Sequence, residues 1–234
     1  MIKAVFFDVD DTLYSQRQPF DRAFEELLAP HYDLPCAELY VHYKEHTDEI
    51  YHHFMNGEWT LDQVAIYRLQ TAMKDYGIDY PDEDCLRFQD AYFSNQQSIT
   101  LSDTIKEMLT YLKDKVLIGV ITNGQSEHQR RKMGVLKLQD YMPAENILVS
   151  TETPYSKPDP RLFKVMEERF SLAPEECLYI GDALLNDMQG AKSAGWETIY
   201  LNRRNTMPNA EEEKNVDLMV MTEEELLEEI KRRF

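Results

Sequence analysis

Short apolar runs alternate along most of the chain with segments in which apolar residues recur at helical spacing. Short runs rich in aromatic and β-branched side chains predict buried strands. Such runs occupy residues 2–7, 116–121, 147–149, 178–180 and 198–201, and a run at 218–220 predicts an edge strand. Strands that alternate with helices imply a parallel sheet with right-handed crossovers. We therefore expect an α/β fold with a doubly wound, Rossmann-like core.

The expected helices of this core carry recognisable end signals. Asp159 followed by Pro160 predicts an N-cap and a first-turn proline, and Gly195 is expected to end a short helix over residues 187–194. Thr222, with Glu225 three residues later, predicts a capping box for the last helix.

The stretch 16–98 has a different pattern, with helical periodicity and no convincing strand. Leu61, Val64 and Ala65 begin one such helix, and Gly77 is a plausible stop for it. The stretch is rich in aromatic residues, which we interpret as the core of a small helical bundle. We expect two domains: an α/β core from residues 1–15 and 99–234, and an inserted all-helical cap from 16–98.

Composition and charge narrow the function classes. The chain has 234 residues, 43% of them hydrophobic, and a formal net charge of −18. This charge disfavours nucleic acid polymers and anionic membranes as partners, because both need a basic face. No stretch approaches the roughly 20 apolar residues that span a bilayer, and early aspartates argue against a signal peptide. Three widely spaced cysteines read as reduced thiols, so we expect a cytoplasmic protein.

Reactive residues follow three of the predicted strands. Asp8 and Asp10 come after the first strand, Thr122-Asn123-Gly124 after the second, and Gly181-Asp182 after a later one. Ligands of parallel sheets bind beyond the carboxyl ends of the strands, so these segments should converge there. If strand alternation continued, residues at spacing two would point the same way, which would place both carboxylates on one side.

Four motifs in a fixed order carry a family resemblance. Asp8-x-Asp10-x-Thr12, Thr122-Asn123-Gly124, Lys157-Pro158 and Gly181-Asp182-x-x-x-x-Asp187 resemble the motifs of the haloacid dehalogenase-like superfamily. The helical insertion lies where that superfamily has its helical cap. The resemblance implies a phosphoric monoester hydrolase, and the details look most like the nucleoside 5′-monophosphate phosphatases, with phosphoglycolate-type phosphatases sharing most of them.

The resemblance also implies a role for each motif residue. Asp8 would be the nucleophile that forms an aspartyl-phosphate, and Asp10 the general acid and base. The Thr122 hydroxyl and the Asn123 backbone N–H, in the loop that Gly124 completes, would donate to the phosphoryl oxygens. Lys157 would supply positive charge to those oxygens and to Asp8.

The implied cofactor is Mg²⁺, because the candidate ligands are all oxygens. Asp182 would bind the ion together with an Asp8 carboxylate oxygen and the Asp10 backbone carbonyl. Asp187 would bind it through a water or orient the lysine. Asp11 stands where many relatives have glycine, which points to a residue with positive φ, a conformation that aspartate tolerates.

Other charged and aromatic residues have simpler interpretations. His42, His46 and His53 have helix-compatible spacing, which favours a solvated or packed helix face over a metal site. We interpret Arg130-Arg131-Lys132 as surface charges of a helix, and Arg203 and Arg204 as structural. Trp59 or Tyr51 could stack a nucleobase, although packing in a core is the default interpretation.

Competing functions share these motifs. A phosphomutase of the same fold, or a phosphatase of phosphoglycolate or of sugar phosphates, would keep all four. A non-catalytic binding protein is disfavoured because every reactive group is present, and Asp10 argues against true dehalogenase chemistry. We expect a small phosphorylated metabolite as substrate and a cap that opens and closes on hinges near residues 14–19 and 95–100. The oligomeric state is not readable from the sequence.

Overall fold

The chain folds into two compact units. The computed structural model describes the backbone of all 234 residues and all side chains except those of Tyr51 and Met55, so the stacking role considered for Tyr51 lies outside the described residues. The first unit joins Met1–Ser15 to Thr100–Phe234, and is called the α/β unit; the second is Gln16–Ile99, the helical unit. Among the described residues, no helix has the length and apolar character needed to cross a membrane.

The α/β unit is built on one six-stranded sheet. Its strand order is β3-β2-β1-β4-β5-β6, and every neighbouring pair is parallel. The strands are β1 (Ala4–Phe7), β2 (Leu117–Thr122), β3 (Ile147–Val149), β4 (Cys177–Gly181), β5 (Glu197–Leu201) and β6 (Leu218–Val220). The chain passes from β3 on one side of β1 to β4 on the other, so the order reverses around β1. Ligands bind at such a reversal, beyond the carboxyl ends of the strands.

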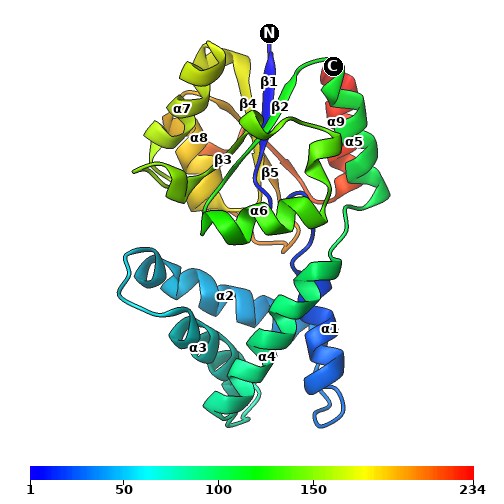
Figure 1. The fold of residues 1–234 in the computed structure, drawn as a ribbon, viewed down its shortest axis with the longest axis vertical. Helices are drawn as coiled ribbons and strands as arrows, with labels where there is room; N and C mark the ends of the chain where they lie inside the picture. The colour runs from blue at the N-terminus through cyan, green and yellow to red at the C-terminus, as the bar shows by residue number, and fades with distance from the viewer. The chain divides into compact units, whose positions relative to one another are not determined.

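Helices cover both faces of this sheet, as a doubly wound fold requires. Figure 1 shows α5 and α9 on one side and α7 and α8 on the other. The helices are α5 (Asp103–Lys113), α6 (Ser126–Val135), α7 (Pro160–Phe170), the π-helical η6 (Leu184–Gln189), α8 (Gly190–Ser193) and α9 (Glu223–Arg233). Short 3₁₀ turns are η2 (Leu138–Asp140), η3 (Ala144–Asn146), η4 (Ser150–Glu152), η5 (Pro174–Glu176) and η7 (Glu213–Asn215). The predicted fold class is confirmed.

One apolar cluster fixes the sheet against α7 and α8. Phe6 of β1 and Tyr179 of β4 pack with Phe163 of α7 and with Trp196, all of them buried. The Phe6 and Trp196 ring centroids are 5.1 Å apart, and those of Phe163 and Tyr179 are 5.2 Å apart. Aromatic pairs at this separation add to the stabilisation from burial. The cluster packs against the strands whose ends carry the candidate site.

The helix-end signals are largely confirmed. Asp159 accepts from the Arg161 backbone N–H at 2.9 Å and caps α7, and Thr222 accepts from Glu225 N–H at 3.1 Å and caps α9. The predicted capping box is wrong in part. Its second hydrogen bond would run from the Thr222 backbone N–H to the Glu225 carboxylate, but that carboxylate accepts from Met221 N–H at 2.7 Å instead. The helix expected over 187–194 begins earlier, as the π-helical turn η6.

The helical unit contains only helices among its described elements. They are α1 (Arg17–Leu27), α2 (Cys36–Met55), α3 (Leu61–Lys74), α4 (Asp82–Asn95) and the 3₁₀ turn η1 (Gln96–Ser98). Phe20 packs its ring against Tyr43 and Phe88, with centroids 5.0 and 5.4 Å away, which confirms the aromatic core. Gly77, with φ of +73°, follows the end of α3. Trp59 is half-buried and stacks on His53 at 5.3 Å.

Candidate active site

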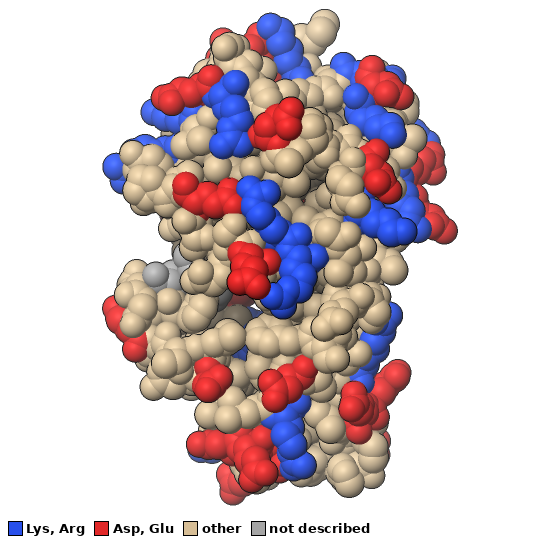
Figure 2. All heavy atoms as spheres, in the orientation of Figure 1, with Lys and Arg blue, Asp and Glu red and all other residues tan. Residues whose placement is uncertain are grey.

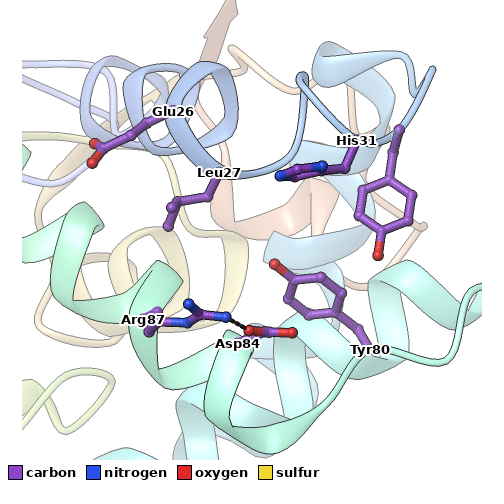
Figure 3. A pocket seen from close by; sticks show the side chains of 7 residues that line it. Glu26, Leu27, His31, Tyr80, Asp84 and Arg87 are labelled. Carbon is purple, nitrogen blue, oxygen red and sulfur yellow. Dashed lines mark hydrogen bonds and ion pairs between the residues drawn. The ribbon is translucent and has the colours of Figure 1, made fainter.

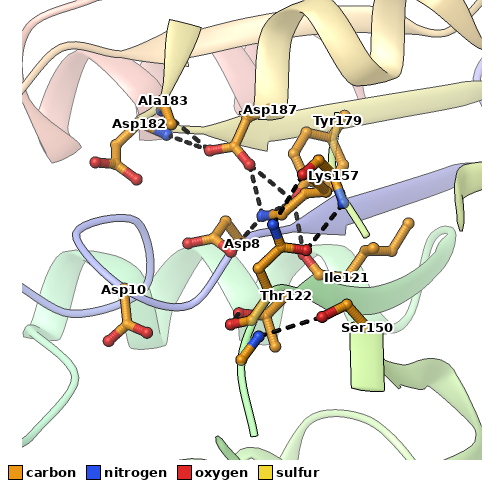
Figure 4. A network of polar contacts seen from close by, with 12 residues as sticks. Asp8, Asp10, Ile121, Thr122, Ser150, Lys157, Tyr179, Asp182, Ala183 and Asp187 are labelled. Atoms are coloured by element: carbon orange, nitrogen blue, oxygen red, sulfur yellow. Dashed lines mark hydrogen bonds and ion pairs between the residues drawn. The ribbon is translucent and has the colours of Figure 1, made fainter. Parts of the chain in front are cut away.

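The carboxyl edge of the sheet brings together residues far apart in sequence. Asp8 follows β1 directly, Thr122 ends β2, and Asp182 follows β4. The Asp8 backbone N–H donates to the Ile180 carbonyl at 3.0 Å, which ties the first of these loops to β4. Figure 4 shows Asp8, Lys157 and Asp187 converging beside Thr122. The expected convergence of the three segments is therefore observed in the α/β unit.

Lys157 is the centre of the cluster. Its ammonium donates to Asp8 Oδ1 and to Asp187 Oδ1, both at 2.6 Å, and to the Tyr179 hydroxyl at 3.1 Å. Its side chain is 3% exposed. Three donors meet three acceptors, so the amine is held at one position beside Asp8.

Burial and neighbouring charges set the protonation states here. Burial raises the pKa of Asp8 to about 6, although Lys157 opposes the rise, and the negative charges of Asp187 and Asp10 add to it. Burial lowers the pKa of Lys157, but Asp187 and Asp8 outweigh it and hold that pKa well above its usual value. At neutral pH the lysine is therefore an ammonium and Asp8 a carboxylate with an unusually high affinity for positive charge.

Asp187 is fully engaged by the protein. Its Oδ1 contacts Lys157, and its Oδ2 accepts from the backbone N–H groups of Asp182 at 3.1 Å and Ala183 at 3.0 Å. The residue is 1% exposed. Of the two roles left open for Asp187, orienting the lysine and the loop after β4 matches this geometry.

Asp182 lies differently, with Arg204 Nη2 at 3.6 Å from its carboxylate. Burial raises its pKa well above the ordinary value, helped by the negative charge of Asp11, while Arg204 opposes the rise. One carboxylate oxygen from each of Asp8, Asp182 and Asp187 lies within 4.8 Å of the others. An all-oxygen set with excess negative charge fits Mg²⁺, which prefers such ligands. Asp8 and Asp182 fit direct binding better than Asp187 does.

The loop after β2 is built from the side chain of Asn123. Its Oδ1 accepts from the Lys157 backbone N–H at 2.9 Å, and its Nδ2 donates to the Lys157 carbonyl at 3.0 Å. Gly124 has φ of +136°, and its N–H donates to the Ser150 hydroxyl at 3.2 Å. The buried Thr122 lies beside this loop. Asn123 thus fixes the lysine segment with its side chain, which leaves only its backbone N–H for the donor role expected of it.

Asp10 lies in a separate polar cluster. Lys132 Nζ contacts its two carboxylate oxygens at 2.6 and 2.5 Å, Tyr14 donates to it at 2.6 Å, and Gln129 at 3.0 Å. Burial raises the pKa of Asp10, but Lys132 above all outweighs it and holds the pKa well below its usual range. In Figure 4 the Asp10 carboxylate points away from Lys157.

Two expectations need correction at this cluster. The strand β1 ends at Phe7, so alternation along a strand does not set the directions of Asp8 and Asp10, which contact different lysines. Lys132 is not a surface charge: it is 4% exposed and paired with Asp10. Arg130 and Arg131 are exposed, as expected, and pair with Glu152 and Glu127.

The turn after Asp10 is held by an arginine. Asp11 has φ of +58°, as its place in the motif indicated. Arg203 donates to the carbonyls of Asp11 at 2.7 Å and Thr12 at 2.8 Å and pairs with Glu223 at 2.6 Å. Arg203 is therefore structural, as expected, whereas Arg204 reaches Asp182 in the site.

Sequence reasoning missed Tyr179, Lys132 and Gln129. Tyr179 donates to the Ile121 carbonyl at 2.6 Å while it accepts from Lys157, yet in sequence it is one apolar-looking residue of a buried strand. Gln129 and Lys132 are three residues apart on α6, a spacing that places both on one helix face. Their spacing gave a signal, but only the fold shows that this face meets Asp10.

A second hollow lies on the helical unit (Figure 3). Its lining residues are Glu26, Leu27, His31, Tyr32, Tyr80, Asp84 and Arg87. The Arg87 guanidinium already pairs with Asp84, and two carboxylates line the hollow. The acidic cluster at the sheet edge therefore remains the better candidate for phosphate chemistry.

A parallel sheet with clustered carboxylates and a buried lysine at its carboxyl edge is typical of an enzyme with a Rossmann-like fold. Residues 2–195 match the family model for haloacid dehalogenase-like hydrolases. The chain belongs to this family, and the predicted family and enzyme class, a hydrolase, are confirmed.

Named relatives and a solved structure are also similar to the chain. The chain is 27% identical over 222 residues to N-acylneuraminate-9-phosphatase of Rattus norvegicus, covering 88% of this chain and 85% of that protein. It is 25% identical over 207 residues to glyceraldehyde 3-phosphate phosphatase of Pyrococcus furiosus, covering 85% and 80%. The crystal structure of a Bacillus subtilis hydrolase of the same superfamily, bound to magnesium, has a TM-score of 0.72, 24% identity and 98% coverage of both chains. That structural likeness supports the fold.

Proposed function

We propose that the protein is a Mg²⁺-dependent phosphatase that hydrolyses a small phosphomonoester through an aspartyl-phosphate on Asp8. The observation that carries the proposal is the buried contact of Lys157 with Asp8 and Asp187, 2.6 Å to each, at the carboxyl edge of the sheet. A carboxylate nucleophile beside a fixed ammonium suits attack on a phosphoryl group, whose oxygens need positive charge.

The names of the relatives support a sugar-type substrate. They are phosphatases of an N-acylneuraminate 9-phosphate and of glyceraldehyde 3-phosphate, and they align over more than four fifths of this chain. We therefore place phosphates of sugars or sugar acids first among the candidates. The nucleoside 5′-monophosphates suggested by the motif details come second, and phosphoglycolate third.

In the first step, an Asp8 carboxylate oxygen forms a bond to phosphorus and the bond from phosphorus to the substrate oxygen breaks. Lys157 stays on Asp8 Oδ1 and keeps the nucleophile oriented, while its charge offsets that of the phosphoryl oxygens. Asp10 gives a proton to the leaving oxygen, so the alcohol departs neutral. Because Lys132 holds Asp10 as a carboxylate in this structure, Asp10 has to take up a proton before it can act as the acid.

In the second step, Asp10 is already in the required form. Its carboxylate takes a proton from water, and the water oxygen forms the new bond to phosphorus. The bond between phosphorus and the Asp8 oxygen breaks, which releases inorganic phosphate and restores Asp8. The Thr122 hydroxyl and the Asn123 backbone N–H donate to the phosphoryl oxygens in both steps.

Asp8 and Asp182 would hold the metal, with the Asp10 carbonyl as a further ligand, and Asp187 would act by orienting Lys157. A bound Mg²⁺ supplies charge stabilisation to the phosphoryl group. Asp182 has a raised pKa among like charges, so a divalent cation relieves a cost that the protein alone leaves in place.

We also propose that the helical unit, Gln16–Ile99, acts as the cap and sets the substrate range. It is inserted immediately after the Asp10 loop, between Ser15 and Thr100. The motifs of the α/β unit bind the phosphate that all candidate substrates share. Discrimination between substrates then has to come from elsewhere in the chain.

The test is phosphate release from a panel of phosphomonoesters, with wild type beside Asp8→Asn and Asp182→Asn. The panel contains sugar phosphates, sugar-acid phosphates, nucleoside 5′-monophosphates and phosphoglycolate. We expect release that needs both Mg²⁺ and Asp8, with a loss of at least about 10³-fold in Asp8→Asn. Equal activity of Asp8→Asn and wild type would refute the proposal. Conversion of a sugar phosphate into its isomer without phosphate release would identify the phosphomutase instead.

A further inference from the structure

Two histidines and an aspartate of the helical unit lie together and share no residue with the candidate active site. His42 and His46 are four residues apart on α2, so they occupy one face of that helix. Asp75 is the C-cap of α3. Its Oδ2 lies 3.0 Å from His42 Nδ1 and 3.0 Å from His46 Nε2. One carboxylate oxygen thus meets two imidazole nitrogens from a different helix.

The ligand atoms have the spacing of a metal site. One ring nitrogen of each histidine and one Asp75 carboxylate oxygen all lie within 4.8 Å of one another. In a tetrahedral zinc site with bonds of about 2.0–2.1 Å, two ligand atoms are roughly 3.3 Å apart. Small side-chain rotations would therefore bring all three to bonding distance of one ion.

Neighbouring side chains orient the two histidine rings. His46 Nδ1 lies 3.1 Å from the Glu49 carboxylate, so its Nε2 is the nitrogen that faces Asp75. The His46 ring packs edge-on against Tyr67 at 6.4 Å, and the His42 ring packs edge-on against Tyr76 at 5.7 Å. Metal-binding histidines typically direct their second nitrogen at such a carboxylate, which fixes the tautomer and the ring.

The charge and exposure of the cluster favour a cation with open coordination positions. Glu45, at 4.0 Å from His42, and Glu49 add negative charge around the imidazoles. The side chains of His46, His42 and Asp75 are 15%, 39% and 35% exposed, so one side of the cluster faces solvent. Two imidazoles with one carboxylate suit Zn²⁺ rather than Mg²⁺, which prefers oxygen ligands.

We infer that His42, His46 and Asp75 form a Zn²⁺ site with water completing the coordination. An ion there joins α2 to the end of α3 and stabilises the helical unit, because a metal that binds only the folded state raises its stability. The site is independent of the proposed phosphatase reaction.

The test is a Zn²⁺ titration of the full chain in saturating Mg²⁺, with a chromophoric chelator as competitor. We expect one equivalent to bind and the melting temperature to rise. His42→Gln and His46→Gln should each weaken binding at least about 10- to 100-fold, the loss that removing even an outer-shell partner of a metal ligand causes. Both side chains are partly exposed, so the variants are expected to fold, and circular dichroism in EDTA verifies this.

His53→Gln is the matched control. His53 lies on the same helix but pairs with Glu58, so its loss should leave zinc affinity unchanged. Co²⁺ bound in place of Zn²⁺ should give visible absorption bands that His46→Gln removes. The inference is overturned if no zinc binds, if His46→Gln binds it as wild type does, or if Asp182→Asn rather than His46→Gln abolishes binding.

Discussion

At the scale of single residues, Asp8 is a carboxylate whose burial opposes its negative charge. It is 6% exposed and buried against Lys157, and burial raises its pKa to about 6. A raised folded-state pKa means that the protonated form suits the fold better. The favourable contribution is full below the ordinary carboxyl pKa of 3.8 and is lost as the pH rises through about 6. The ionised Asp8 carboxylate therefore lowers the stability of the metal-free protein at neutral pH.

This cost gives a prediction for Asp8→Asn. In EDTA at pH 7.5 the variant should be more stable than wild type by on the order of 1–2 kcal/mol, because the neutral amide removes the buried charge. The difference should shrink as the pH falls to 5, where wild-type Asp8 is protonated. Urea unfolding across this pH range measures it. A variant less stable than wild type at pH 7.5 would contradict the assignment.

The Asp10 carboxylate differs from that of Asp8, because the ammonium of Lys132 compensates its negative charge. Chiefly this lysine holds the pKa of Asp10 low, against the effect of burial. The contribution of Asp10 to the free energy of unfolding is therefore present above the ordinary carboxyl pKa and is lost in acid. Lys132→Met leaves the Asp10 charge uncompensated and should destabilise the protein at pH 7 by about 2–4 kcal/mol.

Arg131→Met is the matched control for that variant, because Arg131 is the adjacent residue and its partner Glu127 is exposed. It should change stability by less than about 0.5 kcal/mol. The double variant Asp10→Asn with Lys132→Met should recover part of the loss. Equal losses in Lys132→Met and Arg131→Met would show that the buried pair has no special weight.

At the scale of elements, the close packing of Asp187 against the end of β4 depends on Gly181, which has no side chain. A Cβ on Gly181 would lie 2.6 Å from Asp187 Cγ and 2.7 Å from its Cβ. Asp187 cannot move aside, because Lys157 and two backbone N–H groups hold it. The close approach of strand and carboxylate therefore requires glycine.

Gly181→Ala should accordingly destabilise the protein by about 1–3 kcal/mol through overpacking. It should also lower kcat at least about tenfold, because Asp187 positions Lys157. Gly134→Ala is the control: nothing lies within 4 Å of a Cβ there, and it should be neutral or stabilising by up to about 1 kcal/mol. Thermal melts and phosphatase assays of both variants decide. Full activity in Gly181→Ala would show that Asp187 need not be held in place.

Element-level patterns also show what the sequence can and cannot predict. The limits of β3 and β6 were predicted to the residue, because short apolar runs bounded by polar and turn residues determine them. The four motifs, through the family resemblance, marked Asp8, Lys157 and Asp182 as site candidates, and the structure places them at one edge of the sheet. The contacts of Lys132 and Tyr179 were not predictable, because they depend on which helix face and which side of a strand meet a segment more than 50 residues away.

At the scale of the whole molecule, charge opposes the proposed substrates. The formal net charge is −18, and Figure 2 shows acidic and basic side chains interspersed over the face in view. A phosphomonoester is itself an anion, so long-range repulsion should slow its approach. Local cations act only at short range, since the Debye length is about 10 Å at 0.1 M salt.

Raising KCl from low to physiological concentration, at saturating Mg²⁺, should therefore increase kcat/KM for a dianionic substrate a few-fold. The value of kcat should stay nearly constant, because screening affects encounter and not the buried chemistry. Steady-state kinetics over a salt series measures both. A steady fall of kcat/KM with salt would show that attraction to the site, not net repulsion, governs approach.

The central position of β1 has a consequence for the making of the protein. Both neighbours of β1 come late in the chain: β2 begins at Leu117 and β4 at Cys177. At about 5–20 residues per second, a ribosome needs roughly 9–34 seconds between the emergence of β1 and that of β4. During that interval Ala4–Phe7, which is fully buried in the finished sheet, lacks at least one of its two neighbouring strands. The segment that leads to Asp8, the proposed nucleophile, is thus the strand that waits longest for its neighbours in a nascent chain.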